Sequence, residues 1–345
     1  MIHPLLQTYG PFDGWMILLL IASVSIGFFT YQVQKATRLV LIGAPDSRFD
    51  SWGPRIKEFI LGWLGQKKVL RDRVAGTMHV LMFWGFLMLA SDMFDLATAN
   101  YFSGELLPEL VVGPWNGMVE LGYTMALIGC VSALVRRVAF TPEKLKGKSQ
   151  LEGNAILLLI FTITTTSFMI ESKEDPSPFW EPIGYQFSEF GLADRTVVVS
   201  YWLHMLAISV FLFLIPLSKH MHLVMAVPNV FFHDTGPAAK MRPLAMGADG
   251  KAVPLEDLDI DSFGVSSYTQ YTWRQLIDGW SCTSCARCQD VCPAYASGKG
   301  LNPMQVIHDV RDYANEHAPL LLSGEAPEEP TMQRITEEAV WARTT

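Results

Sequence analysis

Five segments of this chain are long and apolar enough to cross the hydrocarbon core of a membrane, which takes about 20 residues of α-helix. We predict these spans at 15–33, 74–97, 115–135, 155–170 and 197–217. Charged residues make up only 17% of the chain, against roughly 25% in an average soluble domain, because the spans contain almost none. The sequence therefore predicts an all-α membrane protein, with a five-helix transmembrane bundle over 1–230, a linker over 231–264 and a polar domain over 265–345.

The basic residues of the loops predict the orientation of the bundle, because cytoplasmic loops carry an excess of lysine and arginine. The loops after the second and fourth spans contain only Lys173 and Arg195. The loops after the first and third spans contain Lys35, Arg38, Arg48, Arg55, Lys57, Lys67, Lys68, Arg71, Arg73, Arg136, Arg137, Lys144, Lys146 and Lys148. We expect a multi-pass protein of a bacterial or archaeal inner membrane, with its N-terminus outside and its polar domain in the cytoplasm.

Histidines within or at the ends of spans are functional candidates, because polar side chains are costly in a membrane. The fifth span carries His204 and, at its inner end, His222; the two are 18 residues, or five turns, apart, so both point to one helix face. His79 and His222 then lie at matching depth near the cytoplasmic side, an arrangement that suits the two axial ligands of a haem b. The alternative is that these histidines are polar residues bonded to a neighbouring helix.

Carboxyl groups near the outer ends of the spans are candidates for proton transfer in a quinol pocket. We name Glu120, Asp92 and His204 for this role; solvation among lipid headgroups is the alternative, above all for Asp95. The threonines between Thr162 and Thr166 are expected to bond to carbonyls of their own helix. Cys130 is expected to be a small buried packing residue.

The most specific motif is formed by four cysteines in the polar domain. Cys282, Cys285, Cys288 and Cys292, the last followed by Pro293, have the C-x2-C-x2-C-x3-C-P spacing of bacterial ferredoxins, which bind [4Fe–4S] clusters. Zinc is the alternative, but zinc sites typically use two cysteine pairs a dozen or more residues apart. A short helix is predicted at 271–277 before the motif. A second follows Asn302, which is expected to cap it, and runs to about Glu316.

The membrane part resembles the gamma subunit of respiratory nitrate reductases over about residues 10–230. The similarity lies in His204 and His222, with Pro216 and Ser218 between them, and in Gly76–His79 at the start of the second span. The resemblance implies an inner haem b on His79 and His222, and a possible second haem site at His204. Leu89 stands where that family has a further histidine, so this chain departs from the pattern at the second site.

The polar part resembles, over about 265–345, the α-helical ferredoxin of succinate dehydrogenase and heterodisulfide reductase iron–sulfur subunits. That fold has two cysteine motifs, and the fourth cysteine of each ligates the other cluster. Here the second motif is missing, and Arg343 stands where its first cysteine would be. Either Cys292 closes one local cluster, or a partner supplies the rest, or the chain is a truncated version of a longer protein, which we favour.

The combination of the two parts is similar to the electron-transfer-flavoprotein:menaquinone oxidoreductases and related Fe–S oxidoreductases. The resemblance implies electron transfer between the (mena)quinone pool, haem b and a cytoplasmic [4Fe–4S] centre. The expected partner is a soluble electron-transfer flavoprotein or a disulfide-reductase subunit. No catalytic residue of a terminal reaction can be named. The alternatives are a haem-free membrane anchor that docks an Fe–S or catalytic subunit, and an inactive remnant. The net charge of −8 argues against a nucleic-acid partner.

Overall fold

The computed structural model of the chain describes residues 3–97, 109–140, 148–236 and 267–327, with positions 256 and 265. Almost all the described residues that form regular structure are helical; the exception is a short hairpin of β1 (Thr8–Tyr9) and β2 (Phe12–Asp13). Five helices are long and apolar enough to cross a membrane, which confirms the predicted fold class: α1 (Gly14–Leu41), α3 (Arg73–Ala97), α4 (Glu109–Ala139), α5 (Lys148–Glu171) and α7 (Asp194–Leu217).

The chain divides into two compact units, 1–30 with 66–218, and 31–65 with 219–345. Each unit combines stretches that are distant in sequence, and α1 contributes to both. The division predicted from solvent preference, with boundaries near residues 230 and 264, remains a prediction.

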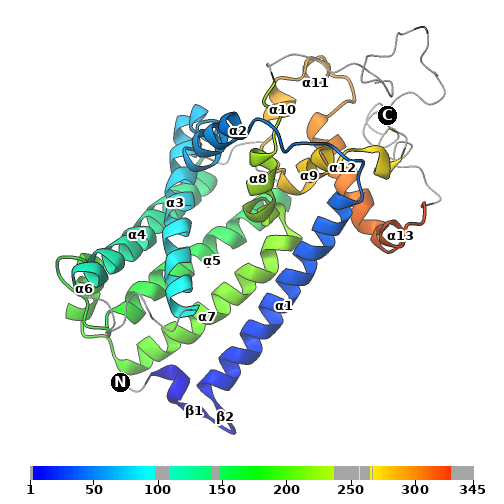
Figure 1. Cartoon of the computed structure of the whole chain (residues 1–345). Helices are drawn as coiled ribbons and strands as arrows, with labels where there is room; N and C mark the ends of the chain where they lie inside the picture. Colours follow the sequence, from blue (N-terminus) through cyan, green and yellow to red (C-terminus); the bar gives the residue numbers. More distant parts are fainter. Residues whose placement is uncertain are drawn as a thin grey trace. The chain divides into compact units, whose positions relative to one another are not determined.

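In the first unit, helices α3, α4, α5 and α7 lie side by side (Figure 1). Small residues let α3 and α4 approach closely: a Cβ atom on Gly85 would lie 2.7 Å from the backbone nitrogen of Ala126. Such contacts are typical of helices that pack within membranes, where small residues bring the backbones together. The short helix α6 (Pro182–Glu189) lies in the loop between α5 and α7.

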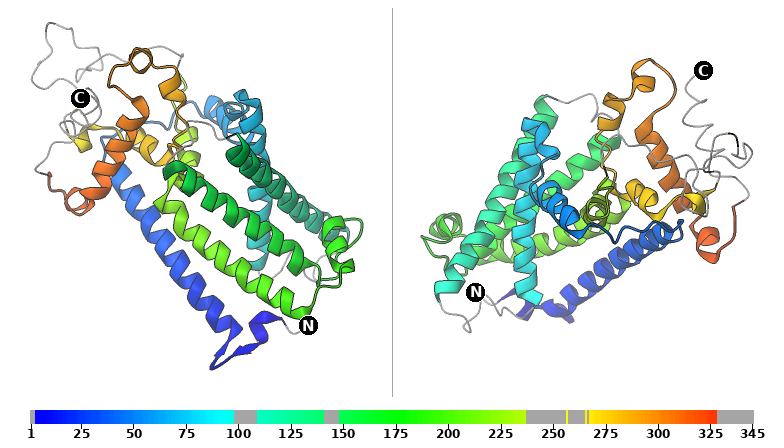
Figure 2. Two further views of the ribbon diagram at one scale, coloured as in Figure 1. Left: turned by 180° about the vertical axis from the view of Figure 1, so that it is seen from behind. Right: turned by 45° about the horizontal axis from the view of Figure 1, so that its top comes forward.

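The second unit is built around a buried apolar core. The end of α1 contributes Leu39 and Val40, and α8 (His222–Phe231) contributes Met225. Helix α9 (Trp273–Ser281) packs between α8 and α12 (Pro303–Glu316), as both views of Figure 2 show. The remaining helices of this unit are α2 (Trp52–Phe59), α10 (Arg287–Asp290), α11 (Pro293–Ala296) and α13 (Ala318–Ser323).

The structure confirms the predicted helix after the cysteine motif. The side chain of Asn302 accepts hydrogen bonds from the backbone N–H groups of Met304 (3.1 Å) and Gln305 (3.2 Å). It therefore satisfies two of the donors that a helix leaves free at its first turn. Pro303 occupies the first helical position, where its missing N–H is harmless.

One inference from spacing is wrong. The fifth spanning helix does not run through to His222, because α7 ends at Leu217 and Ser218 has an extended backbone (φ −130°, ψ 175°). A 3-10 turn over Lys219–Met221 follows before α8 begins. Pro216 lies at the end of α7, and a proline within a helix removes one backbone hydrogen bond. His204 and His222 therefore do not lie on one continuous helix face.

Candidate functional site

The four motif cysteines lie in the second unit, at successive turns of the chain. Cys282 follows the last residue of α9, Cys288 lies in α10, and Cys292 immediately precedes α11. Cys285 lies between them and is exposed, whereas the other three are half-buried. All four are free thiols.

The loop that joins the first three cysteines contains two residues in the left-handed region, Ser284 (φ 56°) and Ala286 (φ 60°). Residues other than glycine rarely adopt this conformation, and here it occurs on both sides of Cys285. Tight backbone turns of this kind suit a motif in which successive thiolates bind one small inorganic group.

The core fixes the helix that precedes the motif. Leu276, Ile277 and Trp280 of α9 are at most 5% exposed. The hydroxyl of Thr272 accepts a hydrogen bond from the N–H of Gln275, whose side chain bonds back to the Thr272 N–H, which closes a capping box. The predicted helix at 271–277 is thus shifted by a few residues, and its end lies directly before Cys282.

A polar network joins α9 to α8. The side-chain amide of Asn229 donates to the carboxylate of Asp278 and to the hydroxyl of Ser281, both at 2.6 Å. Arg274 donates to Asp278 (2.8 Å) and to the carbonyl of Phe232 (3.1 Å). We call Asn229, Arg274, Asp278 and Ser281 the α8–α9 network. It fixes the residue that precedes Cys282 against the helix that begins at His222.

Two side chains of helix α12, His308 and Arg311, lie near the motif. The hydroxyl of Ser284 lies 3.4 Å from Nε2 of His308. Burial raises the pKa of the Cys282 thiol, and the neighbouring Cys285 and Cys288 raise it further, whereas the charge of Arg311 opposes them. Cysteine binds metals as the thiolate. A positively charged metal group bound among these sulfurs would therefore favour the deprotonated form of Cys282.

The assignment of the four cysteines to an iron–sulfur cluster rests on their spacing in the sequence. Among the described residues, no three cysteine, histidine or acidic side chains converge as ligands of one ion. In a [4Fe–4S] cluster each thiolate binds a different iron, so the sulfurs remain apart.

The candidate haem ligands lie in different units. His79 belongs to α3 in the first unit and is half-buried; His222 is the first residue of α8 in the second. Nδ1 of His222 lies 2.8 Å from the carbonyl oxygen of Lys219, and burial lowers the pKa of this imidazole. A histidine ligand usually donates one ring N–H to such a carbonyl and binds the metal through the other nitrogen. The pairing of His79 with His222 remains a prediction from the sequence.

His204 makes contacts that sequence reasoning did not identify. Its Nδ1 lies 3.1 Å from the carbonyl oxygen of Ile163 and 3.0 Å from the hydroxyl of Thr166, both on α5. Thr166 also donates to the carbonyl of Thr162 on its own helix, as predicted for this threonine run. The imidazole therefore bonds to a neighbouring helix, which was the alternative interpretation for these histidines.

Glu120 is buried at 3% exposure, and its carboxylate caps a helix. Its two oxygens accept hydrogen bonds from the backbone N–H groups of Ile183 and Gly184, each at 2.9 Å. These groups lie in the first turn of α6, where donors are free and the helix dipole favours a negative charge. The side chain of Asp92, the other acidic candidate, lies outside the described part of the structure.

Two further glutamates surround the same helix end. Glu181 is 8% exposed and accepts hydrogen bonds from Asn116 and from the N–H of Ser177, both at 3.3 Å. Glu171 lies next to Gly184, and its Oε2 atom is buried without a hydrogen-bond partner among the described residues. This group could not be predicted from the sequence, because both glutamates lie in the acidic loop after the fourth predicted span, where exposure to water is the ordinary expectation.

Cys130 is fully buried and donates a 2.9 Å hydrogen bond to the carbonyl of Leu157 on α5, which confirms its packing role.

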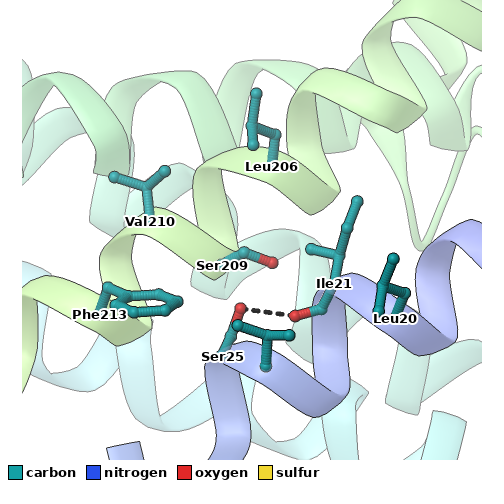
Figure 3. A pocket seen from close by; sticks show the side chains of 8 residues that line it. Leu20, Ile21, Ser25, Leu206, Ser209, Val210 and Phe213 are labelled. Carbon is teal, nitrogen blue, oxygen red and sulfur yellow. Dashed lines mark hydrogen bonds between the residues drawn. The ribbon is translucent and has the colours of Figure 1, made fainter. Parts of the chain in front are cut away.

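A groove of about 280 Å³ lies between α1 and α7 (Figure 3). Its two hydroxyls bond to their own helices, Ser25 to the carbonyl of Ile21 and Ser209 to that of Met205. The groove therefore presents hydrocarbon surface and offers no chemistry of its own.

Comparison with known proteins gives two long matches. The chain is 27% identical to a protein of Syntrophomonas wolfei named EtfAB:quinone oxidoreductase, over 95% of this chain and 47% of that protein. It is 26% identical to the probable iron-sulfur-binding oxidoreductase FadF of Bacillus subtilis, over 87% of this chain and 43% of that protein. The chain thus spans about half the length of these curated relatives.

A third match is shorter. A probable membrane-anchored ferredoxin of Chromohalobacter salexigens is 38% identical over 68 residues, which is 19% of this chain and 10% of that protein. No family model and no solved structure matches the chain. With the five apolar helices, these relatives support a membrane protein of the iron–sulfur type.

Proposed function

We propose that this chain is a membrane-bound oxidoreductase that transfers electrons between the quinone pool, haem b and a [4Fe–4S] centre on the cytoplasmic side. The observation that carries the proposal is the ferredoxin-type cysteine motif in a chain with five membrane-length helices. The names of the relatives point the same way, since one is a quinone oxidoreductase of electron-transfer flavoprotein and another an iron-sulfur-binding oxidoreductase. The redox partner that we propose is accordingly a soluble electron-transfer flavoprotein.

Cys282, Cys285 and Cys288 would bind the cluster as thiolates, with Cys292 as fourth ligand or as a ligand of a second cluster. When bound, such a cluster supplies reversible one-electron transfer. The protein contributes the surroundings. Trp280 and the core beneath α9 exclude water on one side of the motif, and Arg311 places a positive charge near Cys282. Hydrogen bonds, charge and burial of this kind set the reduction potential of a cluster.

His79 and His222 would be the axial ligands of haem b. The bond from the ring of His222 to the Lys219 carbonyl supports this role, because it leaves Nε2 available. His204 would serve only a second haem or the quinone site. For the quinone site we retain Glu120 and Asp92. Protonation of Glu120 would remove the negative charge that accepts the two α6 N–H groups and would weaken both hydrogen bonds, so proton transfer there would be coupled to the stability of the first turn of α6.

Iron and acid-labile sulfide analysis of the anaerobically purified chain tests the cluster. We expect about four irons and four sulfides per chain, and loss of both in the variant Cys285→Ser. The matched control is Cys130→Ser, in which the cysteine outside the motif is changed and the cluster is retained. Zinc without sulfide in the purified chain would contradict the assignment.

A pyridine-haemochrome spectrum tests the haem separately. We expect a b-type α band that is lost in the double variant His79→Ala/His222→Ala and retained in His220→Ala. If the unmodified chain carries the cluster but no b-type band, the chain is a haem-free anchor for an iron–sulfur subunit. If the band survives the double variant, these two histidines are not the ligands.

A further inference from the structure

The loop between α1 and α3 contains a helix that exposes apolar side chains to one side. Trp52, Ile56 and Ile60 follow one another at four-residue intervals and are 51%, 47% and 49% exposed. Residues four apart in a helix lie on the same face, so these three form a continuous stripe. Two neighbouring apolar side chains are also exposed: Leu61 in the turn that follows α2, and Phe49 before it, whose ring also contacts Phe232. We call these five residues the apolar stripe of α2.

The inward side of the same helix is occupied by a charged residue. Arg55 is only 1% exposed. Its guanidinium donates to the carbonyls of Phe231 (3.4 Å) and His233 (2.7 Å) at the end of α8, and to the carboxylate of Asp50 (2.6 Å). The ring of Phe59 packs against Phe231. Trp52 lies at the edge of the stripe, since its ring is half exposed and also contacts Phe231. A helix that places arginine inside and isoleucine outside reverses the pattern of a helix in water.

The chain places this helix at a membrane surface. About 20 helical residues cross the hydrocarbon core, so α1, which has 28 residues, extends beyond it before the loop begins. The next membrane-length helix starts at Arg73. The stretch Trp52–Leu64, helical throughout, is too short to cross the core itself, at roughly 20 Å for 1.5 Å per residue. The loop that contains α2 therefore begins on the side where α1 leaves the core and returns to the core at α3, so α2 lies within reach of the bilayer surface.

The charges near the stripe suit anionic headgroups. Within the loop, the exposed basic residues are Lys57, Lys67, Lys68 and Arg71, and the exposed acidic residues include Glu58 and Asp72. Arg48, Arg55, Asp46 and Asp50 pair with one another and leave little net charge. Basic residues beside an apolar helix face are the features that bind a helix in the plane of an anionic leaflet.

We propose that the apolar stripe of α2 lies in the headgroup–acyl boundary of an anionic phospholipid leaflet and anchors the second unit to the membrane surface there. The occupant is lipid rather than a protein partner, because the loop is bounded on both sides by membrane-spanning helices and its exposed charge is basic.

A nitroxide attached at Ile56→Cys in the full chain tests the proposal. The protein is reconstituted in nanodiscs of phosphatidylcholine and phosphatidylglycerol, and the collision rates of the label with oxygen and with a water-soluble nickel chelate are compared. Glu325→Cys, at an exposed position of the same unit, is the matched control. The unmodified chain, labelled in parallel, gives the background from its own cysteines.

We expect the ratio of oxygen to chelate collisions to be several-fold higher at position 56 than at position 325. A ratio at 56 equal to that at 325 would mean that the stripe is in water and would overturn the proposal. Low collision rates with both reagents at 56 would also overturn it, because the stripe would then be covered by protein. Nanodiscs of phosphatidylcholine alone are expected to lower the ratio at 56.

Discussion

The phenol of Tyr268 shows how single residues hold the second unit together. Tyr268 is 1% exposed, and its hydroxyl donates a 3.0 Å hydrogen bond to the carbonyl of Leu39, 229 positions earlier in the chain. Leu39 lies near the end of α1, where the last carbonyls have no partner within the helix. The bond therefore joins the end of the first spanning helix to the segment that precedes the cysteine motif.

This contact makes stability depend on pH in the alkaline range. Burial raises the pKa of Tyr268 above 10.0, the value of an unperturbed tyrosine, so the folded state retains the phenol proton more tightly than the unfolded chain. The contribution is complete below pH of about 10 and is lost as the pH rises toward the folded-state pKa. Burial of Tyr271 acts in the same direction.

We predict that the thermal unfolding midpoint falls between about pH 8 and pH 11, and that Tyr268→Phe reduces this fall. At pH 8 the variant should lose about 1 kcal/mol, the worth of one hydrogen bond. Circular dichroism of the detergent-solubilised protein measures both effects. Tyr295→Phe, at an exposed tyrosine, is the control. Equal pH dependence in Tyr268→Phe and the unmodified chain would contradict the explanation.

At the scale of residues, the sequence shows which polar side chains are candidates for a special role, but it shows less often which atoms they bond to. The bond of Cys130 could be predicted because its partner lies on an adjacent helix. The carbonyl bonds of Thr162, Thr164 and Thr166 could be predicted because their partners lie on their own helix. For Thr165 the prediction is wrong, since its hydroxyl is buried without a hydrogen-bond partner among the described residues. The cap that Glu120 provides could not, because its partners, Ile183 and Gly184, are more than 60 positions away. The same holds for the bond of His204 to α5. In both cases spacing indicates a costly polar group but not which backbone atoms satisfy it.

At the scale of elements, the close approach of α3 and α4 depends on glycines. A Cβ on Gly85 would lie 2.7 Å from the Ala126 nitrogen and from the Gly122 carbonyl oxygen, and these backbone atoms cannot move aside cheaply. One on Gly129 would lie 2.8 Å from the Met78 oxygen. Dispersion contact along this seam, rather than exclusion of water, stabilises the pair within the membrane.

We therefore predict that Gly85→Ala destabilises the protein by about 1–3 kcal/mol, the usual cost of overpacking. The matched control is Gly27→Ala in α1, where an added Cβ meets nothing within 4 Å. Alanine favours a helix over glycine by about 1 kcal/mol, so the control is expected to be neutral or stabilising. Thermal unfolding in detergent measures the two variants, and equal effects of both would refute the packing argument.

The positions of the helices could be predicted from the sequence better than the contacts between them. Runs of apolar residues located the five spans, and Asn302 with Pro303 located the start of α12. The break at Ser218 did not follow from the spacing of the histidines, because a count of 3.6 residues per turn assumes an unbroken helix and only the backbone reveals the 3-10 turn. Proline near a helix end is a sign of such a break, and Pro216 in the last turn of α7 is that sign here.

At the scale of the whole molecule, the distribution of basic residues predicts that the loop containing α6 faces outside and the cysteine motif faces the cytoplasm. Glu189→Cys and Glu325→Cys place exposed thiols in these two regions. We expect a membrane-impermeant maleimide to label Glu189→Cys in intact cells and Glu325→Cys only after permeabilisation. The unmodified chain gives the background, and the reverse pattern would invert the proposed topology.

The second unit combines residues 31–65 with residues from 219 onward, and this has a consequence for biosynthesis. The ribosome makes the first stretch well before the second, and at about 5–20 residues per second the interval is on the order of ten seconds or more. During that time four further spans enter the membrane, while Arg55 and Leu39 still lack the partners that bury them. The unit is therefore completed late, and a nascent chain that stops before α9 would leave its early half without a core.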